Sequence, residues 1–261
     1  MTCVMRRSRS LTLGTAININ EDNEKSMTNT HTLDHAIGKA AFWSAIVLIA
    51  SAVLSVFFPL DAPAGPFADR MTWYSSNVGA FVAGWLVQMI AMLAISGVFA
   101  GTAWQIRESN PLCAFVAGTA LLISVVAFII PKFFAIWSIQ QMVVASTTVS
   151  ADVAVAEQLF PLLNPYLPFS LHASLEHLGV WMYGVFGLLV ARPLFRLTLS
   201  AKIAAVGLGL FGLLFHILFV GVMAGRVATA EINPYVEWMF FLLMIPVISM
   251  AVYFRKRLKD D

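Results

Sequence analysis

The sequence is poor in charged side chains, and this shortage limits what kind of protein it is. Asp, Glu, Lys and Arg make up only 11% of its 261 residues, whereas 59% are hydrophobic, and the mean hydropathy is +0.82. Soluble domains carry about 25% charged residues, so the composition excludes an ordinary soluble protein. The net charge of +2 also argues against a nucleic-acid partner, because such proteins concentrate positive charge on one face.

Cysteine is almost absent as well. Cys3 lies in a polar tail and Cys113 at the start of an apolar run, which is neither a disulfide framework nor the spacing of a metal site. Residues 172–177 read His-Ala-Ser-Leu-Glu-His, which matches neither HExxH nor HxxEH and so lacks the zinc-peptidase motif. Because no motif demands chemistry, the sequence favours a protein that is not an enzyme, and it identifies no cofactor.

What the sequence does contain is a series of long apolar runs. They cover residues 37–58, 79–103, 112–130, 175–191, 203–224 and 236–254. About 20 apolar residues in a helix cross the ~30 Å hydrocarbon layer of a bilayer. The predicted fold class is therefore all-α, a polytopic transmembrane helix bundle of six spans. An Ala-Pro-Ala at residues 62–64 offers an alternative in which the first run is a cleaved signal, but its length favours a retained helix.

The runs divide the chain into three parts. Residues 1–35 are polar and are expected to form a disordered tail, residues 36–255 a six-helix transmembrane domain, and residues 256–261 a short tail with both basic and acidic side chains. Met27 is an alternative start that removes most of the first tail. In the longest connection, residues 138–160 predict a helix that is either a lid or, more simply, an extension of the third span.

The distribution of Lys and Arg predicts the orientation. Thirteen of these residues fall on one side of the predicted membrane, and only Arg70 and Arg226 fall on the other. Because cytoplasmic connections carry the excess of positive charge, both termini are expected in the cytoplasm of a multi-pass cell-membrane protein, in the bacterial inner membrane. The lipid bilayer is then its first partner, with a small apolar ligand or another membrane protein as further candidates. The oligomeric state is not indicated.

Five ionisable residues lie at the outer ends of the apolar runs, and they are the site candidates. They are His172, Glu176, His177, His216 and Glu237. Ionisable side chains in lipid are costly and therefore point to function. His177 and His216 fall at about one depth and are predicted to bind a cofactor, with His172, Glu176 and Glu237 as metal ligands. The structural alternatives are an interfacial His172, a core His216 bonded to a neighbouring helix, and carboxylates that merely start helices.

Lys132 directly follows Pro131 at the end of the third run. It is expected to be an interfacial anchor whose ammonium reaches towards water.

The fourth and fifth runs form a hairpin with a short basic turn and a glycine-rich second helix. Its sequence at residues 177–217 is HLGVWMYGVFGLLVARPLFRLTLSAKIAAVGLGLFGLLFHI. It resembles an uncharacterised bacterial family of polytopic membrane proteins, domain of unknown function 4386, and the layout of residues 34–254 is similar. The resemblance implies the same architecture and carries no activity and no catalytic residues.

Three functions remain as hypotheses. The favoured one is a non-catalytic binding or regulatory membrane protein that takes a lipid, a small ligand or a protein partner. The first alternative is a haem- or metal-binding redox protein that uses the outer His and Glu cluster. The second is a small transporter, which is disfavoured because the sequence shows neither ionisable residues at mid-membrane nor an inverted repeat.

Overall fold

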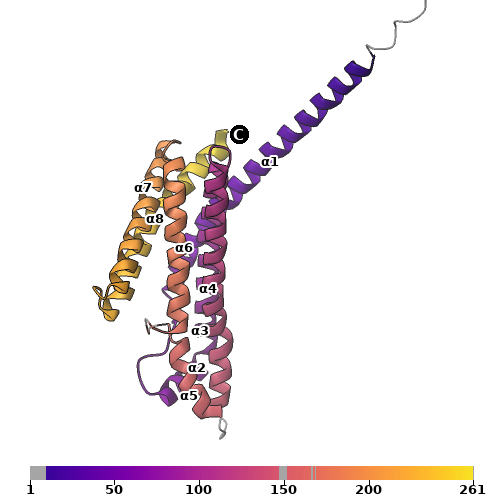
Figure 1. Cartoon of the computed structure of the whole chain (residues 1–261). Coiled ribbons are helices and arrows are strands. Elements are labelled where there is room, and N and C mark those ends of the chain that lie inside the picture. The colour runs from indigo at the N-terminus through magenta and orange to yellow at the C-terminus, as the bar shows by residue number, and fades with distance from the viewer. Residues whose placement is uncertain (1–9, 147–151, 166, 168, 261) are drawn as a thin grey trace, which may run out of the picture.

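The computed structural model describes residues 10–146, 152–165, 167 and 169–260, and the regular structure within these residues is entirely helical (Figure 1). The helices are α1 (Ser10–Ser55), α2 (Phe67–Ser76), α3 (Val78–Ile106), α4 (Pro111–Ser146), α5 (Asp152–Leu163), α6 (Leu171–Leu194), α7 (Leu199–Met223) and α8 (Thr229–Asp260). The prediction of an all-α fold is confirmed.

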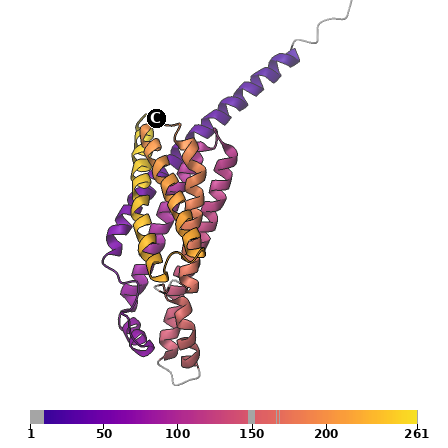
Figure 2. The same cartoon turned by 60° about the vertical axis from the view of Figure 1, so that its left-hand side comes forward.

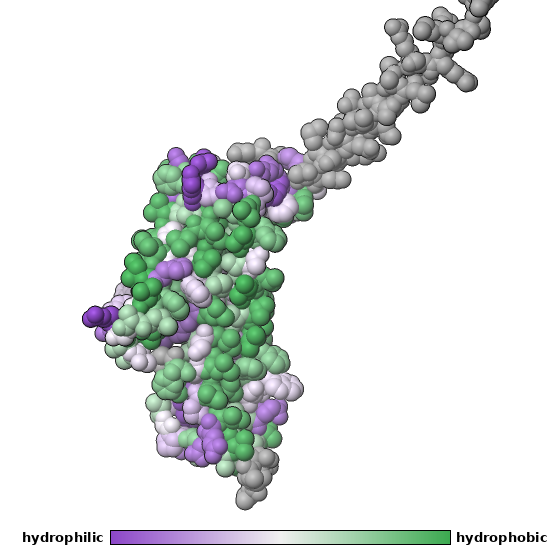
Figure 3. Space-filling model, viewed as in Figure 1, coloured by the Kyte–Doolittle hydropathy of each residue, from purple (hydrophilic) through white to green (hydrophobic). Residues whose placement is uncertain are grey.

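Six of these helices are long and apolar enough to cross a membrane, which confirms the predicted number of spans. They are His31–Ser55 of α1, α3, α4, α6, α7 and Thr229–Lys259 of α8. Figure 3 shows the corresponding surface, with hydrophobic residues over the middle of the visible face and hydrophilic residues gathered towards its ends. The short helices α2 and α5 connect spans and do not cross the membrane.

The six spans close into a ring. Along the chain α1 packs on α3, α3 on α4, α4 on α6, α6 on α7 and α7 on α8, and α8 returns to pack on α1. Figures 1 and 2 both place α2 and α5 at the end of the bundle opposite the C-terminal residues. We call this end the far end and the other the terminal end. Which of the two faces the cytoplasm stays a prediction.

Helix α1 begins at Ser10, inside the polar segment expected to be disordered, and it leads away from the terminal end of the bundle (Figures 1 and 2). The division of the chain into two tails and a membrane domain stays a prediction.

Helix α4 does not end before Pro131, where the sequence analysis placed the end of the third run. It continues through this buried proline to Ser146. Membrane helices tolerate proline because neighbouring helices and local adjustment satisfy the freed carbonyl. Its 36 residues span about 54 Å, more than the hydrocarbon layer needs, so its last turns project at the far end and carry α2 and α5. The predicted helix at 138–160 is thus two helices, an extension of α4 and a separate α5.

The sequence contains two asparagine–proline pairs, at 110–111 and 233–234, and one of them starts a helix. The Asn110 side chain accepts a hydrogen bond from the Cys113 N–H at 3.3 Å, directly before α4 begins at Pro111. The pair at 233–234 lies inside a helix, since α8 already begins at Thr229. Glu237 therefore lies about two turns after the start of its helix.

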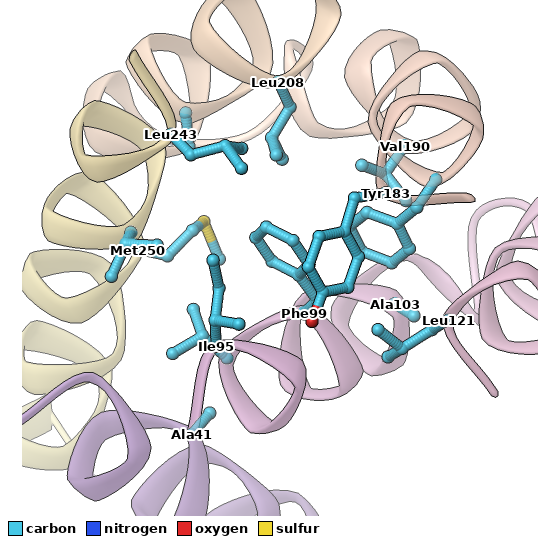
Figure 4. Packing of buried hydrophobic residues seen from close by; sticks show 14 of the residues in the cluster. Ala41, Ile95, Phe99, Ala103, Leu121, Tyr183, Val190, Leu208, Leu243 and Met250 are labelled. Carbon is cyan, nitrogen blue, oxygen red and sulfur yellow. The ribbon is translucent and has the colours of Figure 1, made fainter. Parts of the chain in front are cut away.

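An apolar cluster fills the terminal half of the ring. Phe99 stacks on Phe186 with ring centroids 4.8 Å apart, and Figure 4 shows Leu208, Leu243 and Met250 converging around Phe99 from α7 and α8. The α6–α7 pair is especially close, because a Cβ at Gly212 would lie 2.5 Å from the Gly184 carbonyl oxygen. This agrees with the small-residue face that the fifth run predicts.

Candidate functional site

A cavity of about 440 Å³ lies inside the ring, between α1, α3, α4, α6 and α8. Its walls come from the far-end halves of these helices, from 48–55 in α1 to 233–244 in α8. The apolar cluster of Figure 4 borders the cavity, since Ile95, Tyr183 and Leu243 belong to both. The lining is mostly apolar and aromatic. Its polar members are Ser51, Ser55, Trp85, Gln88, Lys132, Glu176, His177, Tyr183, Asn233 and Glu237. A volume of about 300–1,000 Å³ with a few polar groups is typical of small-molecule sites.

Lys132 and Glu176 form an ion pair at the wall of this cavity. The ammonium donates a hydrogen bond to Glu176 Oε1 at 2.6 Å, and the two side chains are 6% and 31% exposed. The ammonium also lies 5.0 Å from the ring centroid of Phe128 and 5.9 Å from that of Trp85. Because α4 continues past Pro131, Lys132 sits in the middle of a helix and faces the interior. The prediction that it is an interfacial anchor is wrong.

His172 lies behind the ion pair. It is fully buried, its Nε2 is 3.6 Å from Glu176 Oε1, and its ring packs edge-on against Trp85 with centroids 5.1 Å apart. One carboxylate oxygen is therefore shared between an ammonium and an imidazole. The i, i+4 spacing of His172 and Glu176 accounts for their contact within α6. A fully buried ring does not fit the alternative of an interfacial histidine.

Two buried groups at this site lack hydrogen-bond partners among the described residues. They are the indole Nε1–H of Trp85, which is only 3% exposed and lines the cavity, and the ring nitrogens of His172. An unsatisfied buried donor or acceptor costs about 1–3 kcal/mol. A bound molecule with an acceptor atom near Trp85 would remove this penalty.

His177 and Glu237 line the same cavity. The Nδ1–H of His177 donates to the Ala173 carbonyl at 2.6 Å, which leaves Nε2 as a hydrogen-bond acceptor. Glu237 is exposed, and it has no ion-pair partner in the described part of the chain. Two carboxylates therefore line the cavity: that of Glu176 is in an ion pair, and that of Glu237 has no such partner among the described residues.

His216 lies elsewhere, at the contact between α6 and α7. Its Nδ1–H donates to the Gly212 carbonyl at 2.7 Å, and its Nε2 accepts a hydrogen bond from Trp181 Nε1–H at 3.1 Å. The ring faces protein, as the sequence predicts, and both nitrogens are engaged. A metal or haem iron could bind here only by displacing the indole.

The structure therefore gathers four of the five predicted site residues and leaves one apart. Glu176, His177 and Glu237 line one cavity, His172 lies behind it, and His216 does not reach it. Within the described residues, no group of three or more His, Cys, Asp or Glu side chains is placed to hold a metal ion. The metal-ligand and cofactor-binding roles of these residues stay predictions.

Sequence reasoning missed Lys132 and Trp85 as members of the site. A single cationic residue inside an apolar stretch indicates a functional position for Lys132. The proline before it, however, is typical of a helix end. Trp85 carries no such signal, because an aromatic residue in a membrane helix is ordinary.

At the far end, a polar cluster outside the spans joins the connection after α1 to α2. Arg70 Nη2 is 2.5 Å from both Asp61 oxygens, Tyr74 O–H donates to the same carboxylate, and the guanidinium lies 4.7 Å from the Phe160 ring centroid of α5. Burial raises the pKa of the Tyr74 phenol, and the adjacent Asp61 carboxylate raises it further. This cluster joins the connection after α1 to α2 and α5.

Comparison of the chain with protein-family models, with curated proteins and with solved structures finds no match. The functional interpretation therefore rests on the fold and the cavity. Six helices of membrane-crossing length and composition identify the chain as a multi-pass integral membrane protein.

Proposed function

We propose that this protein binds a small amphipathic molecule within its helix bundle and that it acts without catalysing a reaction. The observation that carries the proposal is the 440 Å³ cavity with the Lys132–Glu176 ion pair in its otherwise largely apolar wall. Such a cavity buries an apolar body, while the polar groups orient a polar head.

The ion pair supports a functional role because it is a poor means of stabilising the bundle. Replacing a buried ion pair by well-packed apolar side chains is often neutral or stabilising. Ionisable residues inside membrane proteins line cavities and pathways far more often than they face lipid. A pair that lies at a cavity wall, beside an unsatisfied indole N–H, fits a site for a polar ligand group.

The shape of the ring favours binding over transport. Transport by alternating access requires the site to open to each side in turn. Here the rings of Phe99 and Phe186 stack in the interior of the ring of spans, and a tightly packed apolar interior offers no ready path for a polar substrate. A redox role is less well supported, because both nitrogens of His216 already have partners.

Binding is tested by adding a panel of amphipathic molecules to the protein in lipid nanodiscs. The measured quantity is the shift of the thermal unfolding temperature that each molecule causes. Ala91 of α3 lines the cavity, and Ala100 of the same helix is exposed outside it. Ala91→Phe should abolish the ligand-induced shift by filling the cavity, and Ala100→Phe should keep it. A panel without any binder, or equal shifts in the two variants, would refute the proposal.

The relationship to the domain of unknown function 4386 family is also proposed, on the hairpin of residues 177–217. The cytoplasmic location of both termini and the bacterial inner membrane are proposed on the distribution of Lys and Arg.

A further inference from the structure

The charges of the side chains that line the cavity do not sum to zero. Three of them reach it, namely Lys132, Glu176 and Glu237. Lys132 and Glu176 neutralise each other at 2.6 Å, whereas Glu237 has no ion-pair partner among the described residues. With neutral histidine, the cavity carries one net negative charge.

The helix start does not explain why Glu237 is tolerated at this place. Favourable interaction of a carboxylate with the helix dipole falls off within the first turn, and Glu231 already occupies the first turn of α8. Glu237 lies about two turns after Thr229, inside a membrane-crossing helix. Its carboxylate is exposed and lines the cavity, so it is open to a cationic group of a ligand.

Two of the remaining polar atoms can accept hydrogen bonds from a cationic ligand. Glu176 uses only Oε1 in its contacts with Lys132 and His172, so its second oxygen and the Nε2 of His177 are acceptors for a ligand N–H. An anion would add to the net negative charge of the side chains that line the cavity, and repulsion between like charges is stronger in a medium of low dielectric constant.

The aromatic wall supplies a second attraction for positive charge. Trp85, Phe128, Tyr183 and Phe240 line the cavity. The Lys132 ammonium already lies 5.0 Å and 5.9 Å from the ring centroids of Phe128 and Trp85, within the ~6 Å over which cation–π attraction is significant. The volume of about 440 Å³ is far larger than a metal ion requires, so the cation is organic.

We infer that the ligand is a hydrophobic organic cation, an amine on an apolar body, whose charge is balanced by Glu237 while its body fills the cavity. This inference rests on the proposed function, because it specifies the ligand of the same cavity.

The test uses three ligands that share one alkyl chain: a primary amine, the carboxylate of equal length and the corresponding neutral amide. Dissociation constants are measured by calorimetry at neutral pH with protein in nanodiscs of uncharged lipid, and empty nanodiscs correct for partition into the bilayer. Wild-type protein should bind the amine at least about tenfold more tightly than the amide, a difference of about 1.4 kcal/mol. The carboxylate should bind most weakly.

Glu237→Gln should remove this preference, weakening amine binding about tenfold and leaving amide binding unchanged. Glu231→Gln is the matched control, because Glu231 lies on the same helix and does not line the cavity, and it should retain the preference. Amide binding by Glu237→Gln shows that the variant is folded.

The outcomes separate the two proposals. Equal binding of amine and amide, tightest binding of the carboxylate, or an unchanged preference in Glu237→Gln would overturn the inference of a cation and leave the binding function standing. If none of the three ligands binds, the cation inference is overturned. If no molecule of the amphipathic panel used to test the proposed function binds either, the binding function is overturned as well.

Discussion

Removing Glu176 should destabilise the protein more than removing Lys132, although the two residues form one ion pair. The Lys132 side chain is 6% exposed and that of Glu176 is 31% exposed. Glu176→Leu leaves an almost fully buried ammonium without a counter-charge. Lys132→Met leaves a carboxylate that is partly exposed, so solvent can reach it.

The magnitudes follow from these two environments. Removing one partner of a buried ion pair costs about 3–5 kcal/mol, whereas replacing both by apolar side chains is often neutral or stabilising. We expect Glu176→Leu to lower the free energy of unfolding by about 3 kcal/mol. Lys132→Met should lower it by about 1 kcal/mol, because solvent compensates the remaining, partly exposed carboxylate. The double variant should be more stable than Glu176→Leu alone.

The assay is unfolding by SDS titration in mixed micelles for the wild type, both single variants and the double variant, which form a double-mutant cycle. Lys202→Met is the control, since Lys202 is exposed at the start of α7 and its loss should change stability by less than about 0.5 kcal/mol. If both single variants lost the same amount of unfolding free energy, the predicted difference between Glu176→Leu and Lys132→Met would be refuted. If the double variant were no more stable than Glu176→Leu, the unpaired Lys132 ammonium would not be the cause of the lower stability of Glu176→Leu.

Three further predictions concern other parts of the molecule. His216→Ala should cost about 1 kcal/mol in unfolding free energy, because it removes the acceptor of the partly buried Trp181 Nε1–H, and amphiphile affinity should stay unchanged. Loss of a bound chromophore or metal in this variant would instead support the redox alternative. The raised pKa of Tyr74 favours the neutral phenol in the folded protein, so its contribution to stability is complete below pH ~10 and is lost as the pH rises above it. Tyr74→Phe should therefore lose less stability than the wild type between neutral and strongly alkaline pH, and equal losses would contradict the assignment. Reporter fusions after Arg107, after Lys202 and at the C-terminus should behave as cytoplasmic, and one inserted at residues 147–151 as exported; the reverse pattern would overturn the orientation.

Sequence alone was sufficient for the fold class and the number of spans. The bilayer imposes a minimum helix length and excludes polar residues from long stretches, so six apolar runs such as 203–224 had one plausible structural outcome. Local contacts were also predictable, because helical spacing by itself brings His172 next to Glu176. The close packing of α6 and α7 followed from glycine spacing, which depends only on the surface of one helix.

The membership of the site was decided by tertiary structure. Whether Lys132 meets water or Glu176 depends on α4 continuing past Pro131 and on the side of α4 that faces α6, and no local pattern contains that information. Whether His177 and His216 meet depends on the rotation of two helices about their own axes. In the structure one ring lines the cavity and the other bonds to Trp181.

The sequence by itself determined that the chain crosses the membrane six times and where its ionisable residues lie along each helix. Only the tertiary structure decided which of them share a cavity, because a helix fixes the depth of a side chain while its neighbours fix its direction. Contact between α8 and α1 closes the ring of spans, and residues of both helices line the cavity. It also brings Glu237 to the same cavity as Glu176, a residue that lies 61 positions earlier in the chain.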